Sequence, residues 1–127
     1  MNPTPYEQVG GDAKVRALVD RFYALMDSEP EYYGIRKLHP ESLKGFADKL
    51  YMFLSGWLGG PQLYMEKIGH PMLRARHLPY PIATPERDQW LSCMQRALQD
   101  REVPELLRLQ LMGAFQHTAD WMRNKEG

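Results

Sequence analysis

Apolar side chains recur at helical intervals along most of this chain. Those within residues 15–26 share one helix face: Val15, Leu18, Val19, Phe22, Tyr23 and Met26. The segment Gly10–Asp12 precedes this face. Its two glycines separate the helix from a short opening helix, and Asp12 is placed to cap it. A proline and a glycine interrupt the pattern afterwards, so residues 29–39 are predicted to form a turn with at most a short helix.

A second long helix is predicted to begin near Pro40, because proline suits the first turn of a helix. Its apolar face comprises Leu43, Phe46, Ala47, Leu50, Phe53, Leu54 and Trp57. The sequence Gly59-Gly60-Pro61 ends this helix. Residues 61–83 contain too many prolines and glycines for another long helix, and only a short helical piece at Met72–His77 fits between them.

Two further helices complete the pattern. The first is predicted to have Thr84 as its N-cap and Pro85 in its first position, and Pro104 opens the second. Their apolar faces comprise, in turn, Trp90, Leu91, Met94, Ala97 and Leu98, and then Leu107, Leu111, Ala114, Phe115, Thr118 and Met122. No strand-like alternation of useful length occurs. The prediction is a single all-α domain over residues 1–127, with four substantial helices.

Composition narrows the class of protein. Sixteen basic side chains balance sixteen acidic ones, which argues against a nucleic-acid partner. The single cysteine, Cys93, excludes an internal disulfide and a multi-cysteine metal site. No run of about 18 apolar residues could span a membrane, and the first residues lack the regions of a signal peptide. We therefore expect a cytoplasmic protein.

Large flat and soft side chains are abundant for a small domain. The chain has eight Met, four Phe, three Trp and seven Tyr. Such side chains can fill a core, and they can also line a pocket for a large flat ligand. Composition leaves both alternatives open.

The four histidines include no pair at i, i+4 and no HExxH motif, so a zinc site of that kind is not encoded. His77 is the most informative of them, because prolines at 79 and 81 fix the backbone just after it. Leu73 shares its helix face, while Arg74 and Arg76 add cations nearby. The pattern could present one imidazole to a metal held mainly by another group, although a lone histidine is more often a surface or core residue.

Five motifs resemble those of one family in order and spacing. They are Tyr6–Gly11, Arg21–Tyr23, Met52–Leu54 followed by Trp57 and Gly59–Pro61, Gly69–His77, and Arg87–Met94. Each motif is weak alone, but five in register from about residue 5 to residue 122 are specific. The sequence resembles the group II truncated haemoglobins.

This resemblance implies a globin-like two-over-two α-helical sandwich around b-type haem, iron protoporphyrin IX. It implies that His77 is the proximal iron ligand. On the distal side, where a gas would bind, it places Tyr23, His39, Phe46, Leu50 and Trp90. Many globins have a histidine where Phe46 stands, so gating by a distal histidine is not expected here.

The resemblance also suggests the remaining contacts with haem. Lys49 and Arg76 are expected to meet the acidic propionates, and Phe53, Leu73 and Tyr80 to line the cofactor. Three distal side chains are expected to donate hydrogen bonds to a bound gas: Tyr23, Trp90 and His39. Hydrogen bonds to a charged acceptor contribute roughly 1.5–3 kcal/mol each, so two donors would slow gas release by about 10²–10⁴.

The expected function is binding of O₂, and also of CO and NO, for oxygen storage or delivery by a monomer or homodimer. A redox alternative at the same site is conversion of NO to nitrate or a peroxidase activity. It would need an external reductase, because the chain has no flavin or nicotinamide motif. A third alternative is a haem-free helical module that binds other proteins and uses its aromatic residues only as core.

Overall fold

The computed structural model describes residues 2–126, and its regular structure is entirely helical there. The helices are α1 (Pro5–Val9), α2 (Asp12–Ser28), η1 (Pro30–Tyr32), α3 (Tyr33–Arg36), α4 (Lys44–Trp57), α5 (Leu63–Lys67), α6 (Leu73–His77), α7 (Thr84–Asp100) and α8 (Glu105–Met122). The all-α prediction is confirmed, including the short opening helix and the short helical piece before His77. Within this range, no helix is both long and apolar enough to cross a membrane.

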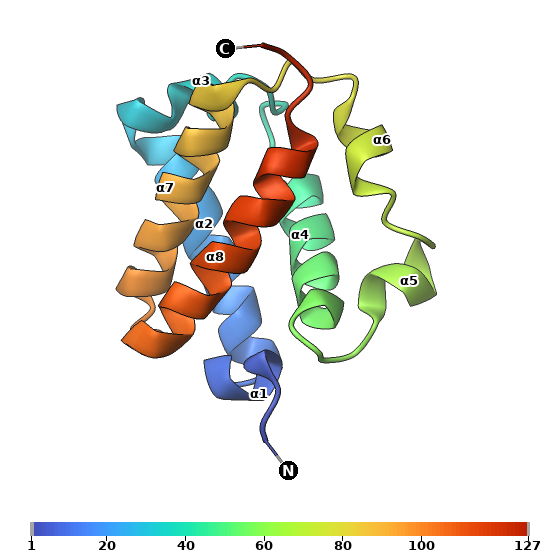
Figure 1. Ribbon diagram of the computed structural model, residues 1–127, viewed down its shortest axis with the longest axis vertical. Helices are drawn as coiled ribbons and strands as arrows, with labels where there is room; N and C mark the ends of the chain where they lie inside the picture. The colour runs from blue at the N-terminus through green and yellow to red at the C-terminus, as the bar shows by residue number, and fades with distance from the viewer. Residues whose placement is uncertain (1, 127) are drawn as a thin grey trace.

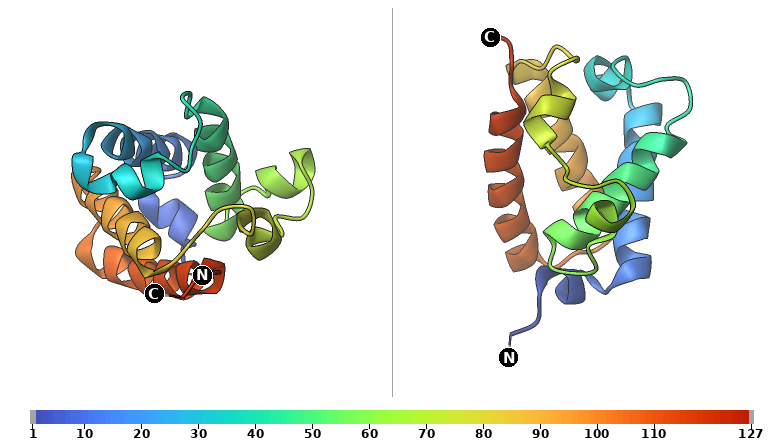
Figure 2. Two further views of the ribbon diagram at one scale, coloured as in Figure 1. Left: turned by 90° about the horizontal axis from the view of Figure 1, so that it is seen from above. Right: turned by 90° about the vertical axis from the view of Figure 1, so that its right-hand side faces the viewer.

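Two antiparallel helix pairs form the body of the molecule (Figures 1 and 2). Helix α2 runs against α4, helix α7 runs against α8, and α2 also contacts α7. This is the expected two-over-two sandwich. The short helices α5 and α6 lie on the far side of α4 and α8, and they are joined by extended chain (Figure 1).

Helix α2 lies at the centre of the core. All six residues of its predicted apolar face are buried, and Val15, Val19 and Phe22 are completely excluded from solvent. Burying one such side chain contributes roughly 1.5–3 kcal/mol, so this face is a principal source of stability. Helix α4 differs, because only Ala47 and Leu54 of its predicted face are buried.

Helix α4 begins at Lys44, so the predicted start near Pro40 is wrong. The guanidinium of Arg36 donates hydrogen bonds to the backbone carbonyls of Pro40 and Glu41, at 2.9 and 2.8 Å. These bonds hold residues 40–41 against α3 in a non-helical conformation. The position of Pro40 could not reveal them, because they depend on a side chain four residues earlier.

Two predicted caps are each displaced by one residue. Asp12 is the first residue of α2 instead of its cap, and its carboxylate accepts a hydrogen bond from Tyr51 of α4. Thr84 is the first residue of α7, and the cap position belongs to Ala83, whose N–H donates to the carboxylate of Glu86 at 2.8 Å. Both corrections lie within the usual variation of helix ends.

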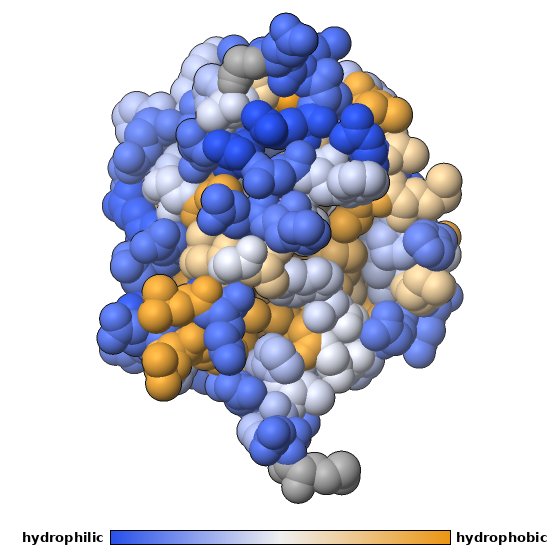
Figure 3. All heavy atoms as spheres, viewed as in Figure 1, coloured by the Kyte–Doolittle hydropathy of each residue, from blue (hydrophilic) through white to orange (hydrophobic). Residues whose placement is uncertain are grey.

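The outer face of α8 departs from the prediction. Ala114, assigned to the buried face, is exposed because it lies at the edge of that face. The first turns of α8 also leave Leu106 and Leu109 open, with 80% and 64% of their surfaces exposed. Figure 3 shows apolar side chains gathered at the lower left of this view, where Figure 1 places the beginning of α8. The opposite face of α8 packs on α7 and closes one side of an internal cavity.

Candidate functional site

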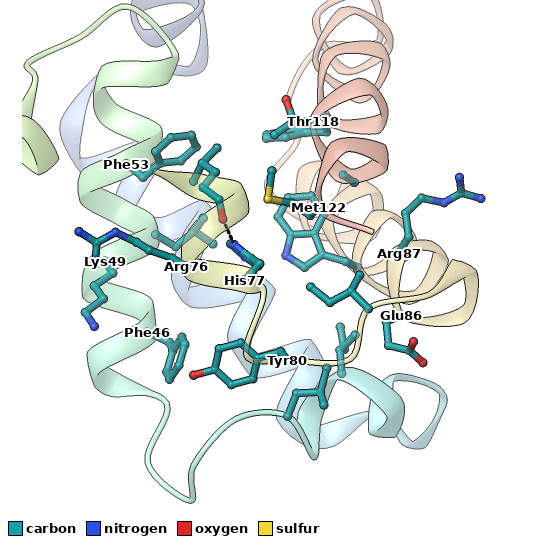
Figure 4. Close-up of a pocket in the computed structure, with 18 of the residues that line it drawn as sticks. Phe46, Lys49, Phe53, Arg76, His77, Tyr80, Glu86, Arg87, Thr118 and Met122 are labelled. Atoms are coloured by element: carbon teal, nitrogen blue, oxygen red, sulfur yellow. Dashed lines mark hydrogen bonds between the residues drawn. The ribbon is translucent and has the colours of Figure 1, made fainter. Parts of the chain in front are cut away.

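A cavity of about 420 Å³ lies between the two helix pairs. This volume is typical of sites for small molecules and cofactors. Its wall includes all eleven site residues predicted from the sequence: Tyr23, His39, Phe46, Lys49, Leu50, Phe53, Leu73, Arg76, His77, Tyr80 and Trp90. They come from α2, the chain after α3, α4, α6 with the chain after it, and α7. Figure 4 shows some of them around the space: Phe46, Lys49 and Phe53 on α4, and Arg76, His77 and Tyr80 on α6 and the chain after it. Residues far apart in sequence therefore converge on one space.

His77 ends α6 with its ring held in a defined orientation. Its Nδ1 lies 2.6 Å from the backbone carbonyl oxygen of Leu73, one helical turn earlier (Figure 4). A carbonyl oxygen can only accept, so Nδ1 carries the hydrogen and the neutral ring keeps its lone pair on Nε2. A hydrogen bond of this kind is the usual way to fix the tautomer of a metal-binding histidine.

Tyr23, on α2, brings a phenol to the wall of the same cavity. Its ring is 8% exposed and packs edge-on against Phe22, with 5.0 Å between the ring centroids. Burial raises the pKa of the Tyr23 hydroxyl, so the group stays protonated. Its one hydrogen bond, to the carbonyl oxygen of Phe46, is long at 3.5 Å. The hydroxyl is therefore a donor that a ligand could recruit at little cost.

His39 stands beside Tyr23 and Phe46, with ring centroids 5.9 and 4.7 Å away. Its Nδ1 lies 2.8 Å from the carbonyl oxygen of Ile35, so this nitrogen donates and Nε2 has a lone pair. Burial lowers the pKa of His39, which favours the neutral ring. The donation to a gas that the sequence suggested for His39 would therefore require the protonated ring. In the neutral ring, Nε2 can only accept, because the one N–H hydrogen is on Nδ1 and is donated to the carbonyl of Ile35.

Trp90 reaches the cavity from α7 between two aromatic rings. Its centroid lies 5.3 Å from that of Phe22 and 5.5 Å from that of Phe115, which in turn stacks on Trp57 at 4.6 Å. The indole N–H has no hydrogen-bond partner among residues 2–126. Every polar side-chain atom that is fully buried in this range does have such a partner. The N–H is therefore accessible, and it adds a second donor to the cavity wall.

Three cations line the cavity, but only two are free of carboxylate partners. Arg87 pairs with Asp88 at 2.9 Å and with Asp120. Lys49 and Arg76 form no ion pair with the residues that the structure describes. Both are exposed at the rim, and Figure 4 shows them on the same side of the cavity. This edge can accept an anionic group.

Arg74 does not contribute to this edge, although the sequence suggested a cation there. Its guanidinium donates to the backbone carbonyls of Trp121 and Arg123, at 2.6 and 3.0 Å. The two arginines of α6 are two residues apart and therefore point in different directions from the helix. Arg76 faces the cavity, and Arg74 faces the end of α8.

Sequence reasoning missed several residues of the wall. They include Ile35, Leu38, Tyr64, Ile82, Ala119 and the paired Arg87. Tyr64 comes from α5, which was not predicted because five residues between Pro61 and Gly69 are too few to show a helical period. The apolar periodicity of α8 did identify Thr118 and Met122, which also line the cavity, but it could not say that they face a space instead of a neighbouring helix.

Comparisons with known proteins agree with this architecture. The family model of bacterial-like globins matches residues 4–124. The group 2 truncated haemoglobin YjbI of Bacillus subtilis (strain 168) is 42% identical over 121 residues, which is 95% of this chain and 89% of the relative.

Two solved structures are similar over almost their full length. The group II 2-on-2 haemoglobin of the plant pathogen Agrobacterium tumefaciens has a TM-score of 0.94 and 46% identity, covering 99% of this chain and 97% of its own. A truncated oxygen-avid haemoglobin from Bacillus subtilis has a TM-score of 0.86 and 42% identity, covering 96% of this chain and 100% of its own.

Proposed function

Since the chain belongs to the bacterial-like globin family, as a group II truncated haemoglobin, we propose that it binds b-type haem in the cavity and holds O₂ there. CO and NO are expected to bind at the same place. The observation on which the proposal depends is the His77 imidazole, whose Nδ1 is bound to the carbonyl of Leu73, which leaves Nε2 as the ring nitrogen available for a ligand bond beside the cavity.

The residues present fit the haem that the globin family implies. The wall between α4 and α8 is mainly apolar, as a porphyrin ring requires, and it includes Phe53, Leu73 and Tyr80. A neutral imidazole with a free Nε2 is the donor that haem iron takes in globins. The unpaired Lys49 and Arg76 at the rim suit the two propionates.

Each of these residues then has a defined task. His77 would ligate the iron, with the carbonyl of Leu73 preventing rotation of its ring. Lys49 and Arg76 would neutralise the propionates, and Phe53, Leu73 and Tyr80 would pack on the ring. When bound, haem would supply an iron atom able to bind a diatomic gas.

Tyr23 and Trp90 would hold the gas by donating hydrogen bonds. The O–H of Tyr23 makes only a long hydrogen bond to the protein, and the N–H of Trp90 makes none with residues 2–126. Phe46 and Leu50 supply apolar surface that keeps water away. His39 would accept a hydrogen bond on the same side. Two donors favour slow release, which supports holding oxygen over rapid delivery. The similar Bacillus subtilis protein is described as oxygen-avid.

The same two donors favour a second candidate function. A protein that releases O₂ slowly retains it long enough to meet another reactant, and NO is the simplest. One NO, one O₂ and one electron together give nitrate, so a separate reductase must supply the electron in each cycle. Nitrate formed from NO only when O₂ and a reductant are both present would support this activity over simple storage.

Absorption spectra of the purified protein test the primary proposal. A Soret band that shifts on reduction, and shifts again under O₂ or CO, is the expected result. The variant His77→Ala is expected to lose stoichiometric haem, and His117→Ala is a matched control because His117 is an exposed histidine of α8 outside the cavity. A colourless protein that takes up no added haem would refute the proposal. A normal five-coordinate ferrous spectrum in His77→Ala would refute the ligand assignment.

A further inference from the structure

The segment that presents His77 is not held by core packing. None of the five residues of α6 is buried, and the helix has no side-chain cap. Met72, just before it, has a left-handed backbone with φ of 48°. The principal helix contact of α6 is with α8. Some interaction other than apolar burial must therefore fix the position of His77.

The chain after α8 supplies that interaction through Asn124. The Asn124 side-chain N–H₂ donates to the backbone carbonyl of His77 at 3.2 Å and to that of Tyr80 at 2.8 Å. Its Oδ1 accepts from the N–H of Ile82 at 2.9 Å. The backbone N–H of Asn124 donates to the carbonyl of Ile82, also at 2.8 Å. One side chain thus binds three backbone groups between α6 and α7.

Arg74 makes the reciprocal contact from α6. Its guanidinium donates to the carbonyls of Trp121 and Arg123, and it lies 5.6 Å from the centroid of the Trp121 ring. The last carbonyls of a helix lack partners within the helix, and the helix dipole favours a cation there. Figures 1 and 2 show the chain after α8 beside the connection that follows α6. We call Arg74, Asn124 and the backbone groups that they bind the C-terminal clasp.

We infer that Asn124 is a positioning residue for the proximal histidine, and that the C-terminal clasp sets how firmly His77 engages the haem iron. The inference rests on the proposed role of His77. The His77 ring is fixed to its own helix through Leu73, and the His77 main chain is fixed to the end of the molecule through Asn124. Without the second tether, the whole α6 segment can shift together with the ring that it bears.

The chemistry of Asn124 explains why an amide is needed. An amide both donates and accepts, so it satisfies two carbonyls and one N–H at once. A carboxylate of the same shape keeps the acceptor for Ile82 but turns an oxygen toward the carbonyls of His77 and Tyr80. Asn124→Asp therefore replaces two attractions by repulsion with almost no change in volume. Asn124→Ala removes all three side-chain bonds without adding repulsion.

Three measurements on Asn124→Asp, Asn124→Ala and the control Lys125→Ala test the inference. Lys125 is exposed, and only its backbone N–H joins this junction, so its side chain is dispensable. The measurements are haem release to an acceptor globin, the iron–histidine stretching band of the reduced protein, and amide hydrogen exchange at Leu78, Tyr80 and Ile82. The exchange measurement is repeated on the haem-free protein, so it does not depend on the cofactor.

We expect Asn124→Asp to release haem about tenfold faster, which corresponds to about 1.4 kcal/mol. We also expect it to shift the iron–histidine band and to speed exchange at Leu78, Tyr80 and Ile82 but not in α2. Asn124→Ala should show the same changes at smaller size, and it provides the test if Asn124→Asp does not fold. Lys125→Ala should match the wild type.

Two results would overturn the inference while leaving the proposed function intact. One is a wild-type iron–histidine band and haem release in both Asn124 variants. The other is faster amide exchange with an unchanged band, which would make the clasp a structural tie without influence on the ligand. A wild-type protein with no iron–histidine band would instead refute the proposed function, and amide exchange in the haem-free protein would then still show whether Asn124 holds the segment.

Discussion

Replacing Tyr23 by Phe removes one oxygen atom from the cavity wall and is expected to speed the release of O₂. The hydroxyl is buried, remains protonated because burial raises its pKa, and has only a 3.5 Å hydrogen bond to the carbonyl of Phe46. The ring itself packs against Phe22 and His39, and Phe retains those contacts. The substitution therefore removes a donor and little else.

The size of the effect follows from the partners of this hydroxyl. A hydrogen bond to a charged acceptor contributes roughly 1.5–3 kcal/mol. The bond to Phe46 that a gas would displace is at the distance limit, so it subtracts roughly 0.5 kcal/mol or less. The remainder, about 1–2.5 kcal/mol, corresponds to a dissociation rate that is about 5- to 70-fold faster. The free energy of unfolding should change by less than about 1 kcal/mol, because no packed atom except the hydroxyl oxygen is lost.

Stopped-flow measurements of O₂ and CO dissociation provide the test. The CO rate should change much less, since CO attracts hydrogen-bond donors weakly compared with the polarised O₂. Tyr32→Phe is the matched control: Tyr32 is a buried tyrosine that bonds Ser92 at 3.2 Å and does not line the cavity. An O₂ rate unchanged in Tyr23→Phe, or raised equally in Tyr32→Phe, would show that the distal hydrogen-bond account is mistaken.

Three further outcomes follow from the charged and titratable groups. Lys49→Ala and Arg76→Ala should each speed haem dissociation by about 1.5- to 5-fold, as expected for exposed ion pairs, while Arg101→Ala should not change it. Burial lowers the pKa of His39 below its usual value of 6.5, so the unfolded chain binds more protons than the folded one. In the haem-free protein, the free energy of unfolding measured with denaturant should therefore decrease as the pH falls below that value, by at most about 1.4 kcal/mol per pH unit. The decrease should be shallower in His39→Phe. Burial also raises the pKa of the Cys93 thiol to about 12. An alkylating reagent at mildly alkaline pH should therefore modify Cys93 only at the rate at which the core opens. Rapid modification of the native protein would contradict the burial of this thiol.

Much of this protein was determined by local sequence. Helical periodicity identified the four long helices, since apolar residues three and four apart share a face in any amphipathic helix. The prolines after His77 predicted a short helix ending at that residue, and α6 does end there. The family resemblance suggested eleven site residues, and the fold gathers them around one cavity, because a similar sequence in the same order folds in a similar way.

The tertiary structure decided how individual polar atoms are used. The carbonyl of Ile35 takes the hydrogen of His39, so an expected donor is an acceptor. Arg74 and Arg76 are indistinguishable as neighbouring cations in the sequence, yet one binds the end of α8 and the other faces the cavity. Asn124 meets the backbone of His77, which lies 47 positions earlier in the chain. Periodicity reports only which side of a helix is apolar, whereas each hydrogen bond depends on angles and distances that arise once the helices have packed.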